Sequence, residues 1–585
     1  MKAKAFDTNV FKRIMVYTKP YKFRFNGVIV WALLLSLFAA LRPYLLKETV
    51  DNYIQSKDES GLAFYLGLMA VVLLLEVAAQ FYFVYWANWL GQDIVKDIRE
   101  KLFKHLLGFR MKYFDNAPVG QLVTRTVSDI EAIAKIFSQG LFMIMSDLSK
   151  MIVVLIFMFF MNWQLTLIVF VAMPILVWVT RIFQKKMQVT FEVVRTQIAA
   201  LNTFVQERVT GMKIVQLFTR EQIEAEKFSE INDKHNKAWI KTVWYNSIFF
   251  PIADIISSLT LGAVVVYGGQ RMLGGDQFTT FGDLSSYTMF IGMLFNPLRQ
   301  IADKFNEMQM GMIAANRVFD ILDTSDEIQD VGTIQAQPFA GNITFENVQF
   351  SYVANEPVIR DLNLEVQSGQ TVAIVGSTGA GKSTIINLLN RFYELDSGKI
   401  TVDNHNINDY TIESLRKQIA VVLQDVFLFA DSLYNNITLF NDDISRERVL
   451  QAAEQIGVAD FIASLPGGLD YNVKERGVML SSGQRQLIAF LRAYVSNPSI
   501  LILDEATSSI DTYSEELIQR ATEKITKDRT SIVIAHRLAT IVNADIIVVM
   551  HKGKVVESGT HSELLLRENG FYKNLYDAQF DVQSA

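Results

Sequence analysis

Cysteine is absent from the 585-residue sequence. This absence excludes disulfide bonds, thiolate metal sites and a cysteine nucleophile. The sequence also has little net charge: acidic residues only slightly outnumber basic ones, and the formal net charge is -6. A chain of this size with so little net charge gives no sign of a nucleic-acid partner. A cleavable signal is not expected either, because residues 1–24 are basic and aromatic and lack a short apolar core.

Hydrophobic residues make up 50% of the chain, and they are unevenly distributed. Long apolar runs dominate up to about residue 306, whereas from about residue 340 the sequence reads as a soluble α/β protein. Six runs are long enough to cross a bilayer, which needs roughly 20 mostly apolar residues. The six predicted spans are Gly27–Leu46, Ala63–Trp86, Leu141–Met161, Leu165–Phe183, Ser247–Tyr267 and Ser285–Ile301.

Lysine and arginine gather on one side of these spans. They precede the first span, follow the second and close the fourth, and cytoplasmic flanks carry this excess. Both termini and the two long connections, residues 87–140 and 184–246, are therefore expected in the cytoplasm. Apolar residues recur at helical spacing in the first connection, so the membrane helices are expected to continue beyond the lipid. Phe6–Tyr17 is expected to be an amphipathic helix on the inner membrane surface or a simple basic leader.

Strands alternate with helices from Gly341 onward, which predicts a mixed sheet with helices on its faces. Acidic and small residues between positions 323 and 327 are typical of a linker. The expected organisation is therefore an all-α transmembrane domain of six helices over residues 1–310, a linker over residues 311–340 and an α/β domain over residues 341–585.

A phosphate-binding loop follows the apolar strand Thr371–Val375. The stretch Gly376-Ser-Thr-Gly-Ala-Gly-Lys-Ser-Thr384 fits the pattern Gly-x-x-x-x-Gly-Lys-Ser/Thr without a mismatch. Its backbone N–H groups and the following helix N-terminus favour an anion. Lys382 is expected to reach the β- and γ-phosphates of a bound nucleotide, and the Ser383 hydroxyl to bind Mg²⁺. The expected nucleotide-contacting residues of the loop are Gly376, Ser377, Thr378, Gly379, Ala380, Gly381, Lys382, Ser383 and Thr384.

Further residues fit the same chemistry. An apolar strand ends in two carboxylates, of which Asp504 is expected to hold Mg²⁺ and Glu505 to polarise the attacking water. Gln424 could ligate Mg²⁺ and that water, or could simply be solvated. His536 could bond the γ-phosphate, or could be structural. Tyr352 could stack on a base, or could pack within its strand.

In this order and spacing, the motifs resemble those of the ATP-binding cassette family, in the P-loop NTPase class. Residues 10–580 resemble one half of an exporter. The resemblance places Asp511 in the D-loop and Gln424, Glu505 and His536 in catalytic positions. It also places a signature motif at residues 480–484, whose polar part would bind the ATP of a partner chain. The signature residues are Ser481, Ser482, Gly483 and Gln484.

The membrane half is similar to lipid A flippases and bacterial multidrug exporters. The similarity is strongest in Tyr113–Gly120 and Gly211–Phe228, stretches that carry coupling helices in those relatives. The resemblance implies an ATP-driven exporter or flippase for lipids or other hydrophobic or amphipathic molecules. It would work by alternating access as a dimer of half-transporters in the bacterial cytoplasmic membrane, with Mg²⁺ at each ATP. An ATP-gated channel or regulator on the same scaffold is the alternative.

One departure from the family pattern concerns the partner chain. Ser482 stands where the signature has glycine, and a side chain there could crowd the γ-phosphate or change the energy of closure. In some paired exporters, the chain with an intact glutamate carries an altered signature and its partner lacks the glutamate. We expect a homodimer, with a heterodimer as the alternative.

Five ionisable residues fall within or at the edge of the predicted spans: Arg42, Glu76, Asp147, Lys150 and Asp254. An ionisable group at the centre of a lipid-facing helix costs roughly 2.5–3.5 kcal/mol. Asp147 and Lys150 share a helix face and could neutralise each other. Glu76 and Asp254 have no cation at helical spacing, so with Arg42 they are candidates for a substrate cavity. Glu76 is expected to favour cationic or zwitterionic amphiphiles.

Overall fold

The computed structural model describes residues 8–274, 278–504, 512–535 and 538–580. The chain divides into two compact units. The first unit comprises residues 1–107 and 117–325, and the second comprises residues 108–116 and 326–585. The short segment 108–116 therefore belongs to the second unit, although in sequence it interrupts the first.

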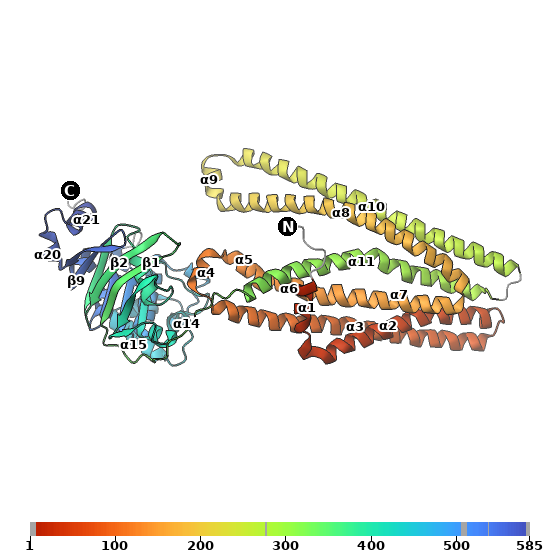
Figure 1. The fold of residues 1–585 in the computed structure, drawn as a ribbon, viewed down its shortest axis with the longest axis horizontal. Helices are drawn as coiled ribbons and strands as arrows, with labels where there is room; N and C mark the ends of the chain where they lie inside the picture. Colours follow the sequence, from red (N-terminus) through yellow and green to blue (C-terminus); the bar gives the residue numbers. More distant parts are fainter. Residues whose placement is uncertain (1–7, 275–277, 505–511, 536–537, 581–585) are drawn as a thin grey trace. The chain divides into compact units, whose positions relative to one another are not determined.

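The first unit is helical throughout its described residues (Figure 1). Its long helices are α2 (Lys22–Glu48), α3 (Glu59–Leu107), α7 (Phe142–Met161), α8 (Trp163–Thr210), α10 (Glu221–Leu273) and α11 (Phe281–Leu322). Its shorter helices are α1 (Thr8–Val16), α5 (Val119–Thr124), α6 (Ile130–Lys135) and α9 (Met212–Leu217). Single turns of other helical types are η1 (Lys19–Tyr21), η2 (Thr49–Ile54), η3 (Arg125–Asp129) and η4 (Ile136–Leu141).

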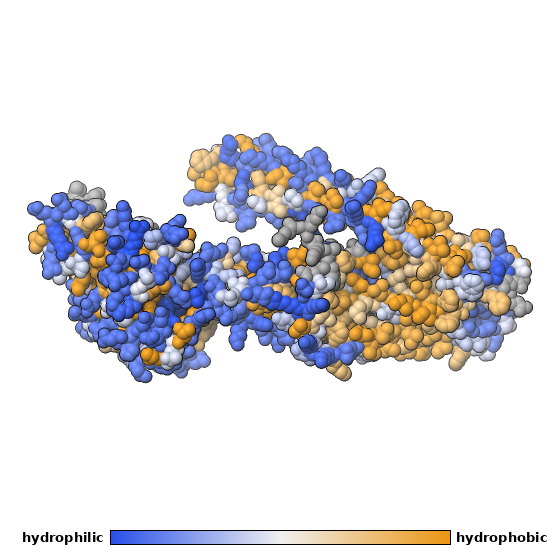
Figure 2. Space-filling model, in the orientation of Figure 1, coloured by the Kyte–Doolittle hydropathy of each residue, from blue (hydrophilic) through white to orange (hydrophobic). Residues whose placement is uncertain are grey.

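Five helical segments of this unit are long and apolar enough to cross a membrane. They are Lys19–Ile54, Glu59–Leu107, Val119–Met161, Trp163–Thr210 and Glu221–Leu273. The sixth predicted span lies within α11, which is not among the five. Figure 2 shows apolar residues gathered over the helices of the first unit, whereas the surface of the second unit is mostly hydrophilic. A broad apolar surface on packed helices is typical of contact with lipid.

Three helices are much longer than a membrane is thick. α3, α8 and α10 have 49, 48 and 53 residues, so at about 1.5 Å per residue each is roughly two and a half times as long as the ~30 Å hydrocarbon core is thick. These lengths agree with the expected extensions beyond the lipid. α11 also continues to Leu322, so the first part of the predicted linker, residues 311–340, is helical. The acidic and small residues after it, and not the end of the apolar run, mark the end of the helix.

Aromatic contacts hold α8 and α10 together along their length. Phe183 packs on Phe249 at 5.6 Å between ring centroids, and Phe204 packs on Phe228 at 6.2 Å. The two helices run side by side to the short helix α9 at one end (Figure 1). Because α9 joins them, the pair behaves as one long helical hairpin within the first unit.

The N-terminal amphipathic segment forms α1, with Val10 and Ile14 buried. Arg13 donates to both carboxylate oxygens of Asp323 at 2.5 Å and lies over the ring of Phe319. The guanidinium holds the pKa of Asp323 below its ordinary value through that hydrogen bond. α1 therefore packs against α11.

The second unit contains two sheets. The larger has the order β10-β9-β3-β8-β7-β6 and the smaller the order β2-β1-β4-β5. The strands are β1 (Ile343–Ser351), β2 (Pro357–Val366), β3 (Thr371–Gly376), β4 (Ser397–Val402), β5 (His405–Asn406), β6 (Ile419–Val422), β7 (Ile500–Asp504), β8 (Thr530–Ile534), β9 (Ile546–His551) and β10 (Lys554–Gly559). Among the described strands of the larger sheet, only β10 pairs antiparallel, which confirms the predicted mixed sheet.

Helices cover this unit and connect its strands. They are α4 (Met111–Asn116), α12 (Lys382–Leu389), α13 (Ile412–Gln418), α14 (Leu433–Thr438), α15 (Arg446–Ile456), α16 (Ala459–Ser464), α17 (Ser482–Val495), α18 (Thr512–Thr526), α19 (Leu538–Val542), α20 (His561–Leu565) and α21 (Phe571–Phe580). Strand β7 is buried along its whole length. Its residues alternate between two cores, with Ile502 in one and Leu501 and Leu503 in the other. Such strands, apolar on both faces, are typical of a parallel sheet covered by helices.

Candidate functional site

The phosphate loop lies between β3 and α12, at the carboxyl edge of the larger sheet. β3 pairs in parallel with β8 and β9. Gly381 has a φ of 99° immediately before α12, a conformation that glycine adopts without steric cost. A Cβ at Gly376 would lie 2.2 Å from the carbonyl oxygen of Met550 on β9. Glycine at these positions therefore lets the chain turn sharply from strand to helix and pass close to the neighbouring strand.

The ammonium of Lys382 lies inside this loop. It donates to the carbonyl oxygens of Gly376 at 2.6 Å and Ser377 at 3.2 Å. The side chain is buried, and burial holds the pKa of Lys382 below its ordinary value, while the charge of Asp504 opposes this shift. A buried cation whose donors point into an anion-sized loop is suited to phosphate oxygens.

The two residues expected to bind Mg²⁺ lie together. The Ser383 hydroxyl donates to the Asp504 carboxylate at 3.2 Å. Ser383 is the second residue of α12, and Asp504 ends β7, which is separated from β3 by β8. The carboxyl ends of parallel strands share one edge, so residues 121 positions apart meet there. A hydroxyl and a carboxylate are hard oxygen donors of the kind that Mg²⁺ prefers, so the residues present fit this ion.

Of the other residues that the sequence predicts at this edge, the structure describes only some. Gln424 follows β6, the strand next to β7, and its side chain is exposed. Glu505, Asp511 and His536 lie outside the described residues. In sequence, Glu505 directly follows Asp504, the last residue of β7, and His536 comes two residues after the end of β8.

Tyr352 lies just after β1 and contacts the helix that follows the phosphate loop. Its hydroxyl donates to the Thr384 hydroxyl at 3.3 Å and accepts from the Asn387 amide at 3.1 Å. A cavity of about 410 Å³ lies beside it. The cavity is lined by Tyr352, Val353, Asn355, Glu356, Pro357, Val358 and Arg360. An aromatic ring and apolar side chains beside a phosphate loop can accommodate a flat base. Sequence reasoning did not identify Asn387.

The signature residues form the N-terminus of α17. Ser481 caps this helix: its hydroxyl accepts from the Gln484 backbone N–H at 3.2 Å, and the Gln484 side chain accepts from the Ser481 N–H at 2.9 Å. Ser482 is the first residue of the helix and is exposed, whereas Gly483 is buried. A 14-residue helix beginning here places a positive dipole end and a hydroxyl at the surface.

The two stretches that resemble coupling helices have different environments. The first contains α4, which belongs to the second unit. There, Arg110 lies 3.0 Å from the Glu394 carboxylate, and the Tyr393 hydroxyl donates to Asp115. The second contains α9, whose Ile214 and Leu217 are 58% and 69% exposed. An exposed apolar helix of this kind usually marks an interaction surface.

The charged residues of the membrane helices pair across helices. Arg42 on α2 lies 3.4 Å from Glu76 on α3, and Asp254 on α10 lies 2.5 Å from Arg299 on α11. Asp147 on α7 pairs with Lys304 on α11.

Two interpretations from the sequence need correction. The local pair of Asp147 with Lys150 is wrong, because Lys304, 157 residues away, takes that carboxylate. Glu76 and Asp254 have no cation at helical spacing on their own helices, but they are not unpaired. Each forms an ion pair with an arginine on a neighbouring helix. Long arginine and lysine side chains reach across packed helices, so these ion pairs cannot be predicted from residue spacing along one helix.

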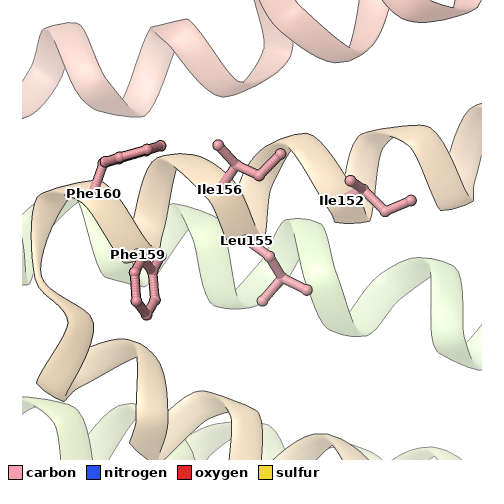
Figure 3. Close-up of a pocket in the computed structure, with 5 residues that line it drawn as sticks. All are labelled: Ile152, Leu155, Ile156, Phe159 and Phe160. Atoms are coloured by element: carbon pink, nitrogen blue, oxygen red, sulfur yellow. The ribbon is translucent and has the colours of Figure 1, made fainter.

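An apolar hollow of about 290 Å³ lies on α7. It is lined by Ile152, Leu155, Ile156, Phe159 and Phe160, with Ile156 and Phe160 extending from one side of the helix and Leu155 and Phe159 from the other (Figure 3). Phe160 is 85% exposed. Such a surface suits lipid tails or another apolar molecule, and it offers no group for chemistry.

Comparison with known proteins adds to this geometry. Residues 25–298 match the family described as ABC transporter transmembrane region, and residues 359–508 match the family described as ABC transporter. An ATP-dependent lipid A-core flippase of Idiomarina loihiensis is 37% identical over 573 residues, which cover 97% of this chain and 98% of the relative. A Staphylococcus aureus protein named for multidrug export, an ATP-binding/permease protein, is 35% identical over 577 residues, covering 97% and 99%.

A solved structure agrees with these relatives. The structure of a bacterial Atm1-family ABC exporter with ATP bound is 29% identical and matches with a TM-score of 0.76. The match covers 98% of this chain and 99% of that chain. The chain therefore belongs to the ABC transporter family, as an exporter in which a transmembrane region is followed by a nucleotide-binding region and ATP hydrolysis drives transport.

Proposed function

We propose that two copies of this chain form a homodimer that moves hydrophobic or amphipathic molecules, such as lipids or drugs, out of the cytoplasm or the inner leaflet. The observation that carries the proposal is the meeting of Ser383 and Asp504 at 3.2 Å beside the buried Lys382. This arrangement supplies a cation for phosphates and two oxygen donors for a metal at one sheet edge. The names of the relatives, a lipid A-core flippase and a multidrug export protein, support the substrate class.

Binding of ATP begins at the phosphate loop. Lys382 exchanges the carbonyl oxygens of Gly376 and Ser377 for the β- and γ-phosphate oxygens, which satisfy its charge better. The base enters the cavity beside Tyr352 and stacks on that ring. Ser383 and Asp504 would hold Mg²⁺, which would supply positive charge to offset the negative charge of the phosphate oxygens.

Hydrolysis uses the residues that follow the neighbouring strands. Glu505 polarises the attacking water, Gln424 orients it, and His536 bonds the γ-phosphate. The second half of each site comes from the partner chain. The N-terminus of its α17, with the capping residue Ser481 and the exposed Ser482, faces the γ-phosphate. Asp511 belongs to the D-loop that meets the partner. Two ATP molecules thus close the two nucleotide-binding regions against each other.

Closure is transmitted to the membrane helices through the long helical extensions. α9 exposes apolar residues that a second copy can cover, and α4 contacts the nucleotide-binding region of its own chain. In the orientation favoured by the basic flanks, both termini and these extensions lie in the cytoplasm, and the protein is an integral protein of the cytoplasmic membrane. Arg42, Glu76 and Asp254 are proposed to border the path of the substrate.

The proposal is tested with the purified full chain in lipid vesicles. Glu505→Gln should lower ATP turnover by about 10²–10⁴-fold, the usual effect of removing a general base, and should retain Mg·ATP. Lys382→Ala should instead weaken nucleotide binding. The control Glu523→Gln, on the surface of α18, should behave as wild type. Turnover of Glu505→Gln within about threefold of wild type would show that another group is the base.

A further inference from the structure

A chain of contacts links α4 to the proposed base site. Residues 108–110 pair with residues 326–328 through the Ile328 N–H, which donates to the Gly108 carbonyl at 2.9 Å. Arg110 lies 3.0 Å from Glu394. Next to Glu394, the Tyr393 hydroxyl donates to the carboxylate of Asp115 on α4. One loop after α12 therefore holds α4 by an ion pair and by a hydrogen bond to a charged acceptor, the stronger kind of hydrogen bond.

Tyr393 also belongs to a group of three rings, Phe350, Tyr352 and Tyr393, which we call the aromatic triad. The Tyr393 and Tyr352 rings meet edge to face, with centroids 5.0 Å apart and an interplanar angle of 89°. Phe350 packs on both, at 4.7 Å from Tyr352 and 5.5 Å from Tyr393. Because each ring touches the other two, a shift of one ring displaces the others.

The other end of the chain of contacts is the phosphate-loop helix. The Tyr352 hydroxyl bonds to Thr384 and Asn387 on α12, and the cavity of about 410 Å³ adjoins its ring. A base that stacks on Tyr352 must fix the position of that ring. The same ring is in contact with Tyr393, whose hydroxyl holds α4.

We propose that Tyr393 is a positioning residue that couples occupation of the base site to the position of α4. The inference rests on the proposed function in one respect, namely that the cavity beside Tyr352 receives the base of ATP. The nucleotide-binding region then signals to the membrane helices through the base as well as through the phosphates. The phosphates act directly on Lys382 and Ser383, whereas the base acts directly on the ring of Tyr352, whose hydroxyl bonds to Thr384 and Asn387. A base-free triphosphate can reach the aromatic triad only indirectly, through the bond of Tyr352 to Thr384, and should therefore move it less than ATP does.

The absence of cysteine makes a direct test possible. Lys112→Cys on α4 is exposed and can carry an environment-sensitive fluorophore as the only thiol. In the full chain in lipid nanodiscs, Mg·ATP should change the fluorescence of this label. Magnesium tripolyphosphate, which has no base, should give at most about a third of that change at saturation. An equal response to the two compounds would overturn the proposal, because the signal would then come from the phosphates alone.

Variants of the two hydrogen-bonded residues localise the coupling. Tyr393→Phe keeps the three rings and removes only the hydroxyl, so it should reduce the ATP response of the label by about 5-fold or more, a typical coupling, while the Kd of ATP changes less than about twofold. Asp115→Ala should act alike, and Asp115→Asn, which keeps an acceptor oxygen, should restore part of the response. The double variant Tyr393→Phe/Asp115→Ala should be no worse than either single variant, since both remove one bond.

A matched control separates this coupling from a general loss of a tyrosine hydroxyl. Tyr494 donates to Gln455 at 3.0 Å between α17 and α15, away from α4, so Tyr494→Phe should leave the label response unchanged. A wild-type response in Tyr393→Phe, or additive losses in the double variant, would overturn the proposal. If ATP binding and hydrolysis stay intact in either case, the proposed function is not contradicted. Failure of the unlabelled wild-type chain to bind ATP would instead refute the proposed function.

Discussion

The carboxylate of Asp283 is fully buried and lies 2.9 Å from the ammonium of Lys47. This pair joins the end of α2 to the start of α11. Asp51 strengthens the same junction, because its carboxylate accepts from the Thr280 hydroxyl at 2.6 Å and from the Gly282 N–H at 2.8 Å. In the proposed orientation this junction faces the outside of the cell. Outward opening of an exporter must therefore loosen these bonds or carry the joined segments as one body.

Removal of the charge of Asp283 should destabilise the membrane region. Asp283→Asn keeps an acceptor for the Thr280 N–H, which Asp283 now receives at 3.1 Å, but leaves Lys47 without its partner. Breaking one side of a buried pair costs about 3–5 kcal/mol, so the thermal unfolding midpoint in detergent should fall clearly. The double variant Lys47→Met/Asp283→Asn should recover most of the loss. An unchanged midpoint in Asp283→Asn would mean that the pair adds nothing to stability.

The pair of Arg42 and Glu76 allows a test of substrate selection. The two groups lie 3.4 Å apart, and the Arg42 Nε atom is buried without a hydrogen-bond partner among the described residues. Such an incompletely satisfied pair can exchange its partner for a charged ligand. Glu76→Gln should reduce ATPase stimulation by cationic amphiphiles much more than stimulation by neutral ones, with basal ATPase largely kept.

The double variant Arg42→Gln/Glu76→Gln serves as the control for this experiment. It removes both charges, so no unpaired arginine is left to disturb the helices. If Glu76 contacts the ligand, the double variant should discriminate between cationic and neutral compounds as poorly as Glu76→Gln does. Equal losses for both classes of compound in Glu76→Gln, recovered in the double variant, would show that Glu76 serves only to neutralise Arg42.

Local motifs could be predicted from the sequence, whereas partners across helices could not. The phosphate loop depends on glycines and a lysine at fixed spacing, and the strand and helix around it follow from short apolar runs. The meeting of Ser383 and Asp504 also follows, because parallel strands end at one edge. In contrast, the choice of Lys304 for Asp147 depends on how α7 and α11 pack. Equally, the composition of residues 108–116 does not show that they belong with the nucleotide-binding region, and only the resemblance of Tyr113–Gly120 to a coupling helix indicates this.

The altered signature distinguishes a homodimer from a heterodimer. Ser482 is exposed at the first position of α17, where a side chain would adjoin the γ-phosphate of the partner site. Ser482→Gly in the purified chain should preserve or raise ATPase activity if the chain works as a homodimer. If the chain requires a different partner, both forms should show almost no ATPase until that partner is co-expressed. Robust activity of the wild-type chain alone would exclude an obligate heterodimer.

The buried Lys382 should make nucleotide binding depend on pH. Burial holds the pKa of this ammonium below its ordinary value of 10.5, and Asp504 opposes the shift only in part. ATP binds the charged form better, so its phosphates raise the pKa of Lys382 in the complex. Affinity is therefore fully present below the pKa of the free protein and is lost as the pH rises through it. Because that pKa is lowered, the loss should begin at a lower pH than an ordinary lysine would give.

The measurement is the Kd of Mg·ATP between about pH 7 and pH 10, at constant free Mg²⁺. Above the pKa of Lys382 in the free protein, the Kd should rise toward about tenfold per pH unit, as expected for one linked proton. Lys382→Arg is the control, since its guanidinium stays charged over this range. Its affinity should be weaker but nearly independent of pH. The same pH dependence in both proteins would assign the titration to another group and would contradict the role given to the Lys382 charge.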